Sequence, residues 1–204
     1  GAMGLTDYVL CKGVNDAFCN SPEEVPGNEQ GMFDYRLRVR MADVTDGSSK
    51  TIAIGEGASG THWPLCADPG CGQPNEGLPE PLPQISPEPY HARQWWIGAG
   101  NAKILQRMLL LSTGGHLACT LEPLNKWPVT QFLFDDGATA NVCAGTFTHG
   151  TQNPHRVPNF RSDHREGGNF LFADGSVRYV QDDVDMDAYR AASTIGGAEF
   201  WDLD

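Results

Sequence analysis

The sequence lacks the residue spacings on which most nucleotide, metal and hydrolase sites depend. Its 204 residues contain no glycine-rich phosphate loop, no His-Glu-x-x-His pair and no Gly-x-Ser-x-Gly elbow. The six cysteines form no Cys-x-x-Cys pair, which argues against a thioredoxin-like redox site and against haem attachment. The six histidines are scattered along the chain, and we expect each to be structural or exposed. These absences favour a protein that is not an enzyme.

Positive charge is scarce and long hydrophobic runs are absent. The chain has 14 Lys and Arg against 26 Asp and Glu, a formal net charge of -12. Because so acidic a surface repels phosphates, nucleic acid is excluded as a partner. No run of about 18 apolar residues is long enough to span a membrane. We expect residues 1–4 to be an expression scar and the start of the natural chain to be out of view. Residues 5–204 are then one globular domain.

The cysteine count predicts disulfides. An even number of cysteines, in a chain with 24 Gly and 14 Pro, is more typical of a disulfide framework than of a zinc site. Proximity in the sequence predicts three local bridges, which join Cys11 to Cys19, Cys66 to Cys71, and Cys119 to Cys143. A metal or a reactive pair is the alternative for Cys66 and Cys71. Since disulfides need an oxidising compartment, we expect an extracytoplasmic protein.

Local patterns predict several elements. Polar and apolar residues alternate over residues 36–42, which predicts a half-buried strand, and the β-branched run 51–55 predicts a core strand. Eight prolines between residues 61 and 93 predict a long loop or insertion. Residues 102–111 fit either a helix or a strand. Asp174 and Gly175 separate two β-rich runs, which predicts a hairpin with a tight primed turn.

The acidic run after this hairpin has two interpretations. Four aspartates offer the hard oxygen ligands that calcium prefers, and calcium is the one cofactor that the sequence suggests. They are Asp182, Asp183, Asp185 and Asp187. Alternatively, they cap and charge the first turn of a short helix over residues 185–193. The calcium-loop glycine and the final glutamate of an EF-hand are missing, so we favour the cap.

The tryptophans raise the question of glycan binding. Trp95 and Trp96 are expected in the core. Trp63 lies in the proline-rich segment, and we expect it to be exposed and to be the candidate for stacking on an extracellular glycan.

The stretch from Ser162 to Asn169 is rich in hydrogen-bonding side chains. Asp163, His164 and Asn169 either bind a ligand or fix the entry to the hairpin, and we favour the architectural role because such side chains commonly bond to backbone groups. Substitution of His164 or Asn169 by alanine is then expected to lower the melting temperature.

Two segments resemble signatures of a known family. The first covers residues 160–180 and the second runs from Asp43 to Glu56. Gly196, Gly197, Ala198 and Glu199 form a third, shorter match. Together they resemble the planctomycete-type pilin-like (pseudopilin-like) family of unknown function, which is also labelled solute-binding. The signature residues are Asp163, His164, Gly167, Asn169, Asp174, Gly175 and Ser176 in the first segment, and Asp46, Gly47, Ser49, Thr51 and Glu56 in the second. Glu166 and Lys50 depart from the pattern, standing where the family usually has Gly and Asn.

The resemblance implies an α+β fold, the loop-rich globular head of a pilin-like protein built on an antiparallel β-sheet. It implies an N-terminal anchor helix, absent from this chain, that holds the full-length protein in the membrane outside the cytoplasm. The implied role is a non-enzymatic structural subunit associated with type II secretion, with other pilin-like or secretion-system subunits as partners. The alternative is an extracellular module that binds a glycan or another solute.

Overall fold

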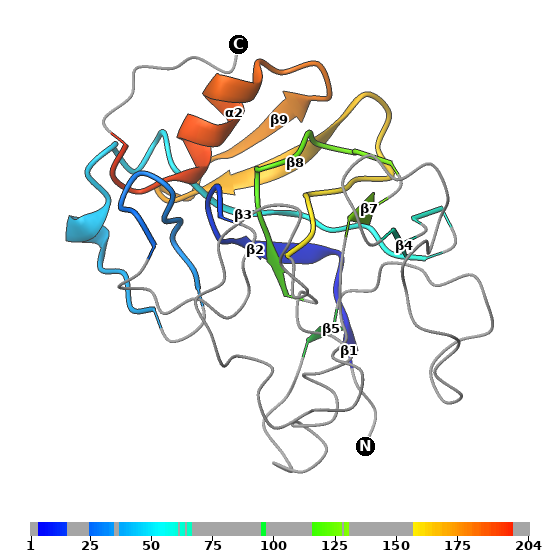
Figure 1. Ribbon diagram of the computed structural model, residues 1–204, viewed down its shortest axis with the longest axis horizontal. Helices are drawn as coiled ribbons and strands as arrows, with labels where there is room; N and C mark the ends of the chain where they lie inside the picture. The colour runs from blue at the N-terminus through cyan, green and yellow to red at the C-terminus, as the bar shows by residue number, and fades with distance from the viewer. Residues whose placement is uncertain are drawn as a thin grey trace.

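The computed structural model describes residues 4–15, 25–34, 37–60, 62–63, 65–66, 95–96, 116–127, 129–130 and 157–197. Their main element is a five-stranded sheet with the strand order β6-β2-β3-β8-β9 (Figure 1). Its strands are β2 (Tyr8–Cys11), β3 (Ile52–Glu56), β6 (Leu117–Ala118), β8 (Gly167–Phe172) and β9 (Val177–Gln181). The helix α2 (Met186–Ser193) follows β9.

Short strands make two further pairs. β1 (Gly4–Leu5) pairs antiparallel with β5 (Trp95–Trp96), and β4 (Leu65–Cys66) pairs parallel with β7 (Val129–Thr130). In the main sheet β2, β3, β8 and β9 are antiparallel neighbours, whereas β6 pairs parallel with β2. The fold is therefore α+β with a mixed sheet. The antiparallel sheet that the resemblance implies is found in β2, β3, β8 and β9, and β6 makes the sheet mixed because it joins the edge of β2 from a distant part of the chain.

Strand β3 occupies the centre of the sheet and confirms the core strand predicted at residues 51–55. On one face of the sheet, the ring of Phe170 meets Phe160 edge-on at 5.1 Å between centroids and meets Tyr189 of α2 at 6.0 Å. A Cβ atom at Gly55 would lie 2.6 Å from both phenylalanine rings. Only glycine lets the aromatic rings approach the strand so closely, so the core depends on its presence in β3.

The predicted hairpin is confirmed, but its turn differs from the prediction. The backbone N–H of Gly175 donates to the carbonyl of Phe172 at 2.9 Å, and Gly175 has a φ of +88°. Asp174 is not among the non-glycine residues with positive φ, which excludes a primed turn of type I′. Instead, Asp174 Oδ1 accepts from the N–H and the hydroxyl of Ser176. This side-chain bond holds Asp174 in an ordinary conformation, and glycine alone takes the left-handed position.

The strand predicted at residues 36–42 is wrong where the structure describes it. Residues 37–40 are not in a strand, and Met41–Asp43 form a short 3₁₀ helix. The Asp43 carboxylate accepts from the backbone N–H of Arg40 at 2.8 Å and from its guanidinium. Local bonds of this kind compete with strand pairing and override the alternating pattern. The segment at 102–111 and most of the proline-rich segment lie outside the described residues.

Helix α2 confirms the prediction of a capped helix. Asp185 is the N-cap, and its side chain accepts from the backbone N–H groups of Asp187 and Ala188. Arg190 lies in the last turn, where a cation is favoured by the helix dipole. None of the helices in the described part of the chain is long and apolar enough to cross a membrane.

A buried ion pair links β2 to the segment that runs beside it. Lys12 Nζ lies 2.9 Å from Asp34 Oδ2, and the two side chains are 0% and 2% exposed. Backbone bonds bring the segments together, because Gly31 donates to the carbonyl of Lys12 and Phe33 donates to that of Cys11. A lysine directly after a buried strand thus enters the interior instead of the solvent.

Candidate functional site

The candidate site is built around the carboxylate of Glu56, the last residue of β3. Its Oε2 atom accepts from the hydroxyl of Ser162 at 2.6 Å and from the backbone N–H of Asn169 at 3.0 Å. Its Oε1 atom accepts from Asn169 Nδ2 at 3.1 Å and lies 3.2 Å from His164 Nε2. We call these four residues the Glu56 cluster. It joins one residue of the second signature segment to three from the first.

Sheet register explains why these residues meet. Gly55 of β3 is paired with Phe170 of β8, so the following step of the antiparallel ladder sets Glu56 against Asn169. The segment before β8 runs along the end of β3, where Arg161 donates its backbone N–H to the carbonyl of Glu56 at 3.0 Å. This contact places Ser162, and two residues later His164, next to the carboxylate. Backbone pairing thus places Glu56 and Asn169 opposite each other at one end of the ladder.

The space around the carboxylate is narrow. A Cβ atom at Gly168 would lie 3.1 Å from Ser162 Cβ and 3.3 Å from Glu56 Oε2. Asn125 closes the cluster from another side, since its Oδ1 atom accepts from the backbone N–H of Ser162 at 2.7 Å. Glu56 is buried, whereas the side chain of His164 is 61% exposed. The cluster therefore reaches the surface through its histidine.

Hydrogen bonds hold Glu56 in its charged form. Burial by itself would raise the pKa of this carboxyl, but the donors Ser162 and Asn169, assisted by the charge of His164, hold the pKa below its usual range. The hydroxyl of Ser162 donates its hydrogen bond to the carboxylate rather than to His164, so the three residues do not have the nucleophile–base–orienter order of a hydrolase triad. The Glu56 carboxylate therefore accepts hydrogen bonds in its charged form from two neutral donor residues.

Arg161 lies beneath this cluster and is fully buried. Its Nε donates to the carbonyl of Ala58 at 3.0 Å and its NH1 donates to that of Asn159 at 2.9 Å. Burial lowers the pKa of the guanidinium, and the nearby charge of Asp163 opposes that shift. The side chain of Arg161 thus links the segment that follows β3, at Ala58, to the segment that precedes β8, at Asn159.

The second signature segment binds the C-terminal part of the chain. Asp46 Oδ2 accepts from the backbone N–H of Gly197 at 2.8 Å and lies 3.4 Å from Thr194 Oγ1. Thr51 Oγ1 donates to the carbonyl of Gly47, which has a φ of +99°. The carbonyl of Ser49 accepts from Arg178 of β9 at 2.8 Å. This segment therefore connects the end of α2 to the hairpin. Gly196 and Gly197 of the third match are described, and Ala198 and Glu199 lie outside.

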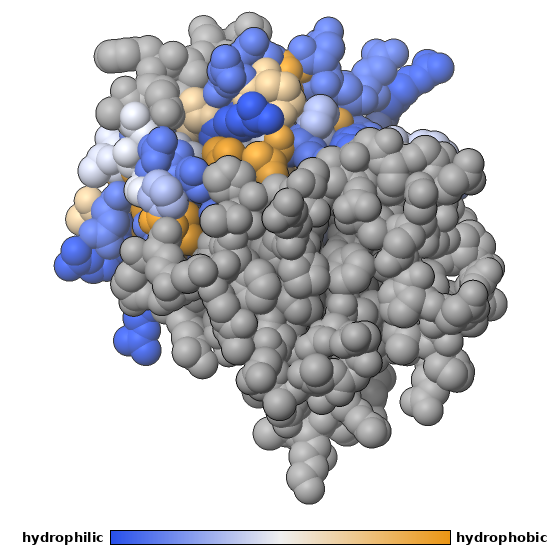
Figure 2. All heavy atoms as spheres, in the orientation of Figure 1, coloured by the Kyte–Doolittle hydropathy of each residue, from blue (hydrophilic) through white to orange (hydrophobic). Residues whose placement is uncertain are grey.

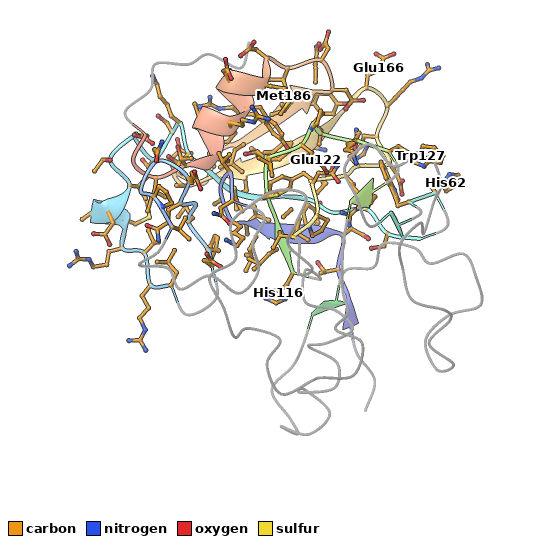
Figure 3. All side chains as sticks on the ribbon, viewed as in Figure 1. His62, His116, Glu122, Trp127, Glu166 and Met186 are labelled. Atoms are coloured by element: carbon orange, nitrogen blue, oxygen red, sulfur yellow. The ribbon has the colours of Figure 1, made fainter. Side chains whose placement is uncertain are left out.

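The remaining residues of the first signature serve turns and packing. Gly167 has no room for a side chain, because a Cβ atom there would lie 2.2 Å from the carbonyl of Val180. Glu166, which stands where the resembling family usually has glycine, has a positive φ of 65° (labelled in Figure 3). A glutamate in this left-handed conformation is strained, so the position favours glycine on conformational grounds.

Trp63 does not form the exposed glycan-stacking surface that the sequence predicted. Its side chain is buried rather than exposed, and its Nε1 atom donates to Asp163 Oδ1 at 2.9 Å. Among the described side chains, Trp127 is an exposed indole, 59% exposed, with Nε1 donating to the carbonyl of His62 at 3.1 Å (Figure 3). Asp163 therefore has a structural partner from the proline-rich segment. The proline-rich surroundings of Trp63 predicted its exposure wrongly, because burial of this side chain depends on its contact with the distant Asp163.

The predicted disulfides at Cys11 and Cys119 are wrong. Both residues are buried thiols, with Cys11 Sγ donating to the carbonyl of Ser193 at 3.6 Å and Cys119 Sγ donating to that of Val157 at 3.4 Å. Burial raises the pKa of Cys11 to about 12, so the thiol stays protonated and unreactive. The apolar strands around these sulfurs explain the difference, because small apolar residues are what the positions require. Cys19, Cys71, Cys143 and the side chain of Cys66 lie outside the described part.

The acidic run is divided among structural tasks. Asp185 caps α2, and Asp182 Oδ1 accepts from Asn125 Nδ2 at 2.6 Å. Asp183 and Asp187 are exposed. Among the described residues, no group of three or more His, Cys, Asp and Glu side chains is placed to hold a metal ion.

Comparison with known proteins gives one match, to a family. No curated protein and no solved structure matches the chain. A family model, described as a protein of unknown function (DUF1559), matches residues 19–187, which is most of the chain and spans both signature segments. The chain therefore belongs to this family of proteins of unknown function.

Proposed function

We propose that the chain is a non-enzymatic, extracytoplasmic structural domain, the head of a pilin-like subunit. The observation that carries the proposal is the Glu56 cluster. Its carboxylate receives hydrogen bonds from Ser162 and Asn169, which are 106 and 113 residues further along the chain, and lies 3.2 Å from Nε2 of His164. The signature residues are thus used to hold two distant segments together. A scaffold that carries surface loops needs such hydrogen bonds between distant segments and does not need a catalytic side chain.

The support for the location is of another kind. An extracytoplasmic location is supported by the resemblance of the two signature segments to pilin-like proteins. Disulfides at Cys11 and Cys119 do not support it, because both residues are free thiols. In that resemblance the sheet and α2 form the head, and partners are other pilin-like or secretion-system subunits. An anchor helix and a membrane location belong to the same proposal.

A second candidate function is favoured by one surface residue. The matching family model is named SBP_bac_10, a solute-binding label, and Trp127 presents an exposed indole whose N–H is already bonded. A flat aromatic face held in this way stacks well on the apolar face of a sugar. The candidate is a module for extracellular glycans, with Trp127 in the place first expected for Trp63.

The two candidates are separated by two measurements. Antibodies against the chain, applied to fractionated source cells, should detect the protein with membranes and in sheared surface assemblies. Recovery in the cytoplasmic fraction would contradict the structural proposal. Calorimetry with neutral and acidic polysaccharides tests the second candidate. Binding that is lost in Trp127→Ala but kept in Tyr8→Ala, where an equally exposed aromatic ring is removed elsewhere, would establish a glycan site.

A further inference from the structure

Two exposed aromatic rings are fixed by hydrogen bonds at their polar edges. Trp127 is 59% exposed, and its Nε1 atom donates to the carbonyl of His62 at 3.1 Å. Tyr179 is 47% exposed, and its hydroxyl donates to the carbonyl of Arg165. The Tyr179 ring covers Gly167, where a Cβ atom would lie 2.7 Å from the Cε1 atom of the ring. Each ring therefore has its polar atom bonded within the chain, and part of its flat face is open to solvent.

Contacts between distant segments bring the two rings to one surface. The side chain of Asn125 donates to the carbonyl of Gly167, the residue that Tyr179 covers, at 3.5 Å. The same amide group donates to Asp182 Oδ1, just beyond the end of β9, at 2.6 Å. Trp127 follows Asn125 by two residues, so its indole and the Tyr179 ring lie at the same end of the sheet.

The exposed imidazole of His164 belongs to this surface. Trp127 bonds to His62, and the next residue, Trp63, donates to Oδ1 of Asp163, directly before His164, at 2.9 Å. The side chain of His164 is 61% exposed, and its Nε2 atom faces the buried carboxylate of the Glu56 cluster. Its Nδ1 atom lies at the other edge of the ring, where it can bond to a hydroxyl group. We call Trp127, His164 and Tyr179 the ring surface.

We propose that the ring surface binds an extended, neutral, β-linked polysaccharide chain. This inference rests on the second candidate function, the glycan module, and adds Tyr179, His164 and a charge preference to the site at Trp127. A β-1,4-linked glucan is a flat ribbon whose sugar rings present apolar C–H faces, and such faces stack on aromatic rings. Two aromatic rings on one surface favour a chain over a single sugar, because the second contact is made within a molecule that is already bound.

The charge around the ring surface favours a neutral ligand. Desolvation raises the pKa of the Tyr179 hydroxyl, and the charges of Asp182 and Glu166 add to the shift, so both carboxylates act on this ring. Arg165 is a neighbouring cation, but the chain as a whole has a net charge of -12, which repels uronate and sulfate groups. Figure 2 shows hydrophilic side chains, with hydrophobic ones interspersed, in the upper part of the molecule. Such surroundings suit a hydroxyl-rich ligand without charge.

Calorimetry with cello-oligosaccharides of increasing length tests the proposal. We expect the affinity to rise with chain length until both aromatic rings are covered. Trp127→Ala should weaken binding of the longest oligosaccharide at least about tenfold, and Tyr179→Ala about fivefold, because each removes one stacked ring. Two matched controls should bind within about twofold of the unaltered chain. They are Tyr179→Phe, which keeps the ring, and Val177→Ala, which shortens another exposed side chain of β9. Circular dichroism verifies that each variant is folded.

The charge preference has its own test. Cello-oligosaccharides oxidised at C6 carry uronate groups and should bind more weakly than the neutral ones at about 0.01 M salt. The difference should shrink at about 0.15 M salt, where the Debye length falls from about 30 Å to about 8 Å. Nuclear magnetic resonance of the unaltered chain needs no variant. The signals of the Trp127 indole, the His164 ring and the Gly167 amide should shift together as the neutral oligosaccharide is added.

Failure of this inference and failure of the glycan module give different results. Binding that needs Trp127 but is unchanged by Tyr179→Ala, or resonance shifts confined to Trp127, would overturn the ring surface and leave the module standing. Tighter binding of the oxidised chains would overturn the preference for a neutral ligand. If the cello-oligosaccharides do not bind but another polysaccharide does, this inference alone is overturned. If no polysaccharide binds, the second candidate function fails with it.

Discussion

Two buried charges in this molecule are stabilised in different ways. The Glu56 carboxylate accepts hydrogen bonds from the neutral donor groups of Ser162 and Asn169 and lies 3.2 Å from His164 Nε2. Lys12 is buried with one described hydrogen bond, to Asp34. A charge with several donors loses only a fraction of its stabilisation when one is removed. A buried ion pair leaves a bare charge in the interior when either partner is lost. The comparison teaches that the number of partners, more than burial, sets how fragile each site is.

The ion pair should show the largest effect. Lys12→Met removes the ammonium group that lies 2.9 Å from the buried Asp34 carboxylate, and we expect the free energy of unfolding to fall by about 3–5 kcal/mol in urea titrations. Replacing both partners, in Lys12→Met/Asp34→Leu, removes both charges and should recover much of the loss. If single and double variants are equally unstable, the pair is not the cause and the contrast with Glu56 fails.

Glu56→Gln should have the next largest effect. An amide accepts fewer hydrogen bonds than a carboxylate, so we expect a loss of about 1–3 kcal/mol at pH 7. The pKa of Glu56 is lowered in the folded state, so its contribution is complete above the unfolded pKa of about 4.3 and is lost as the pH falls through the lower folded pKa. Stabilities measured at pH 7 and at progressively lower pH should therefore converge for the two proteins. A difference that does not shrink on acidification would show that charge is not what Glu56 contributes.

Ser162→Ala removes one donor and should cost about 1 kcal/mol. The carboxylate keeps Asn169 and His164, although the backbone N–H of His164 also loses the Ser162 hydroxyl as its acceptor. Thermal unfolding with Ser49→Ala as a control, an exposed serine that bonds to Arg178 through its backbone carbonyl, separates the cluster from a general effect of removing a serine. A loss of unfolding free energy as large as that of Glu56→Gln would mean that Ser162 alone accounts for the stabilisation of the carboxylate.

His164→Ala should have the smallest effect. Its side chain is 61% exposed, and solvent screens an exposed pair with Glu56, so we expect less than about 0.5 kcal/mol at pH 7. The drop in melting temperature that the sequence predicted for this substitution is thus reduced to a minor one. A loss above about 1.5 kcal/mol would place the histidine among the structural donors.

Local patterns predicted the elements whose determinants are local. The run at 51–55, the Asp174-Gly175 hairpin and the Asp185 cap each depend on residues within a few positions. The alternation at 36–42 failed because the bonds between Arg40 and Asp43 outweigh it. These are short-range effects of comparable strength, and the sequence does not rank them.

The candidate site was only partly predictable. His164, Asn169 and Glu56 were selected as signature residues, but their meeting depends on the register between β3 and β8. The burial of Trp63 and the pairing of Lys12 with Asp34 depend in the same way on contacts between distant segments. The thiols of Cys11 and Cys119 were misjudged because cysteine count carries no information about the distance between sulfur atoms.

The separation of Glu56 from its donors also governs the time course of synthesis. Asn169 leaves the ribosome 113 residues after Glu56, a delay of roughly 6–20 s at typical elongation rates. During that interval the central strand β3 has β2 as a neighbour but not β8, and its carboxylate has no donor from the C-terminal segment. The β8–β9 hairpin and α2 are short-range structures that form soon after they emerge. Strands β8 and β9 therefore complete a sheet whose strands β2 and β3 were synthesised more than 100 residues earlier, and nascent copies have unpaired strand edges until then.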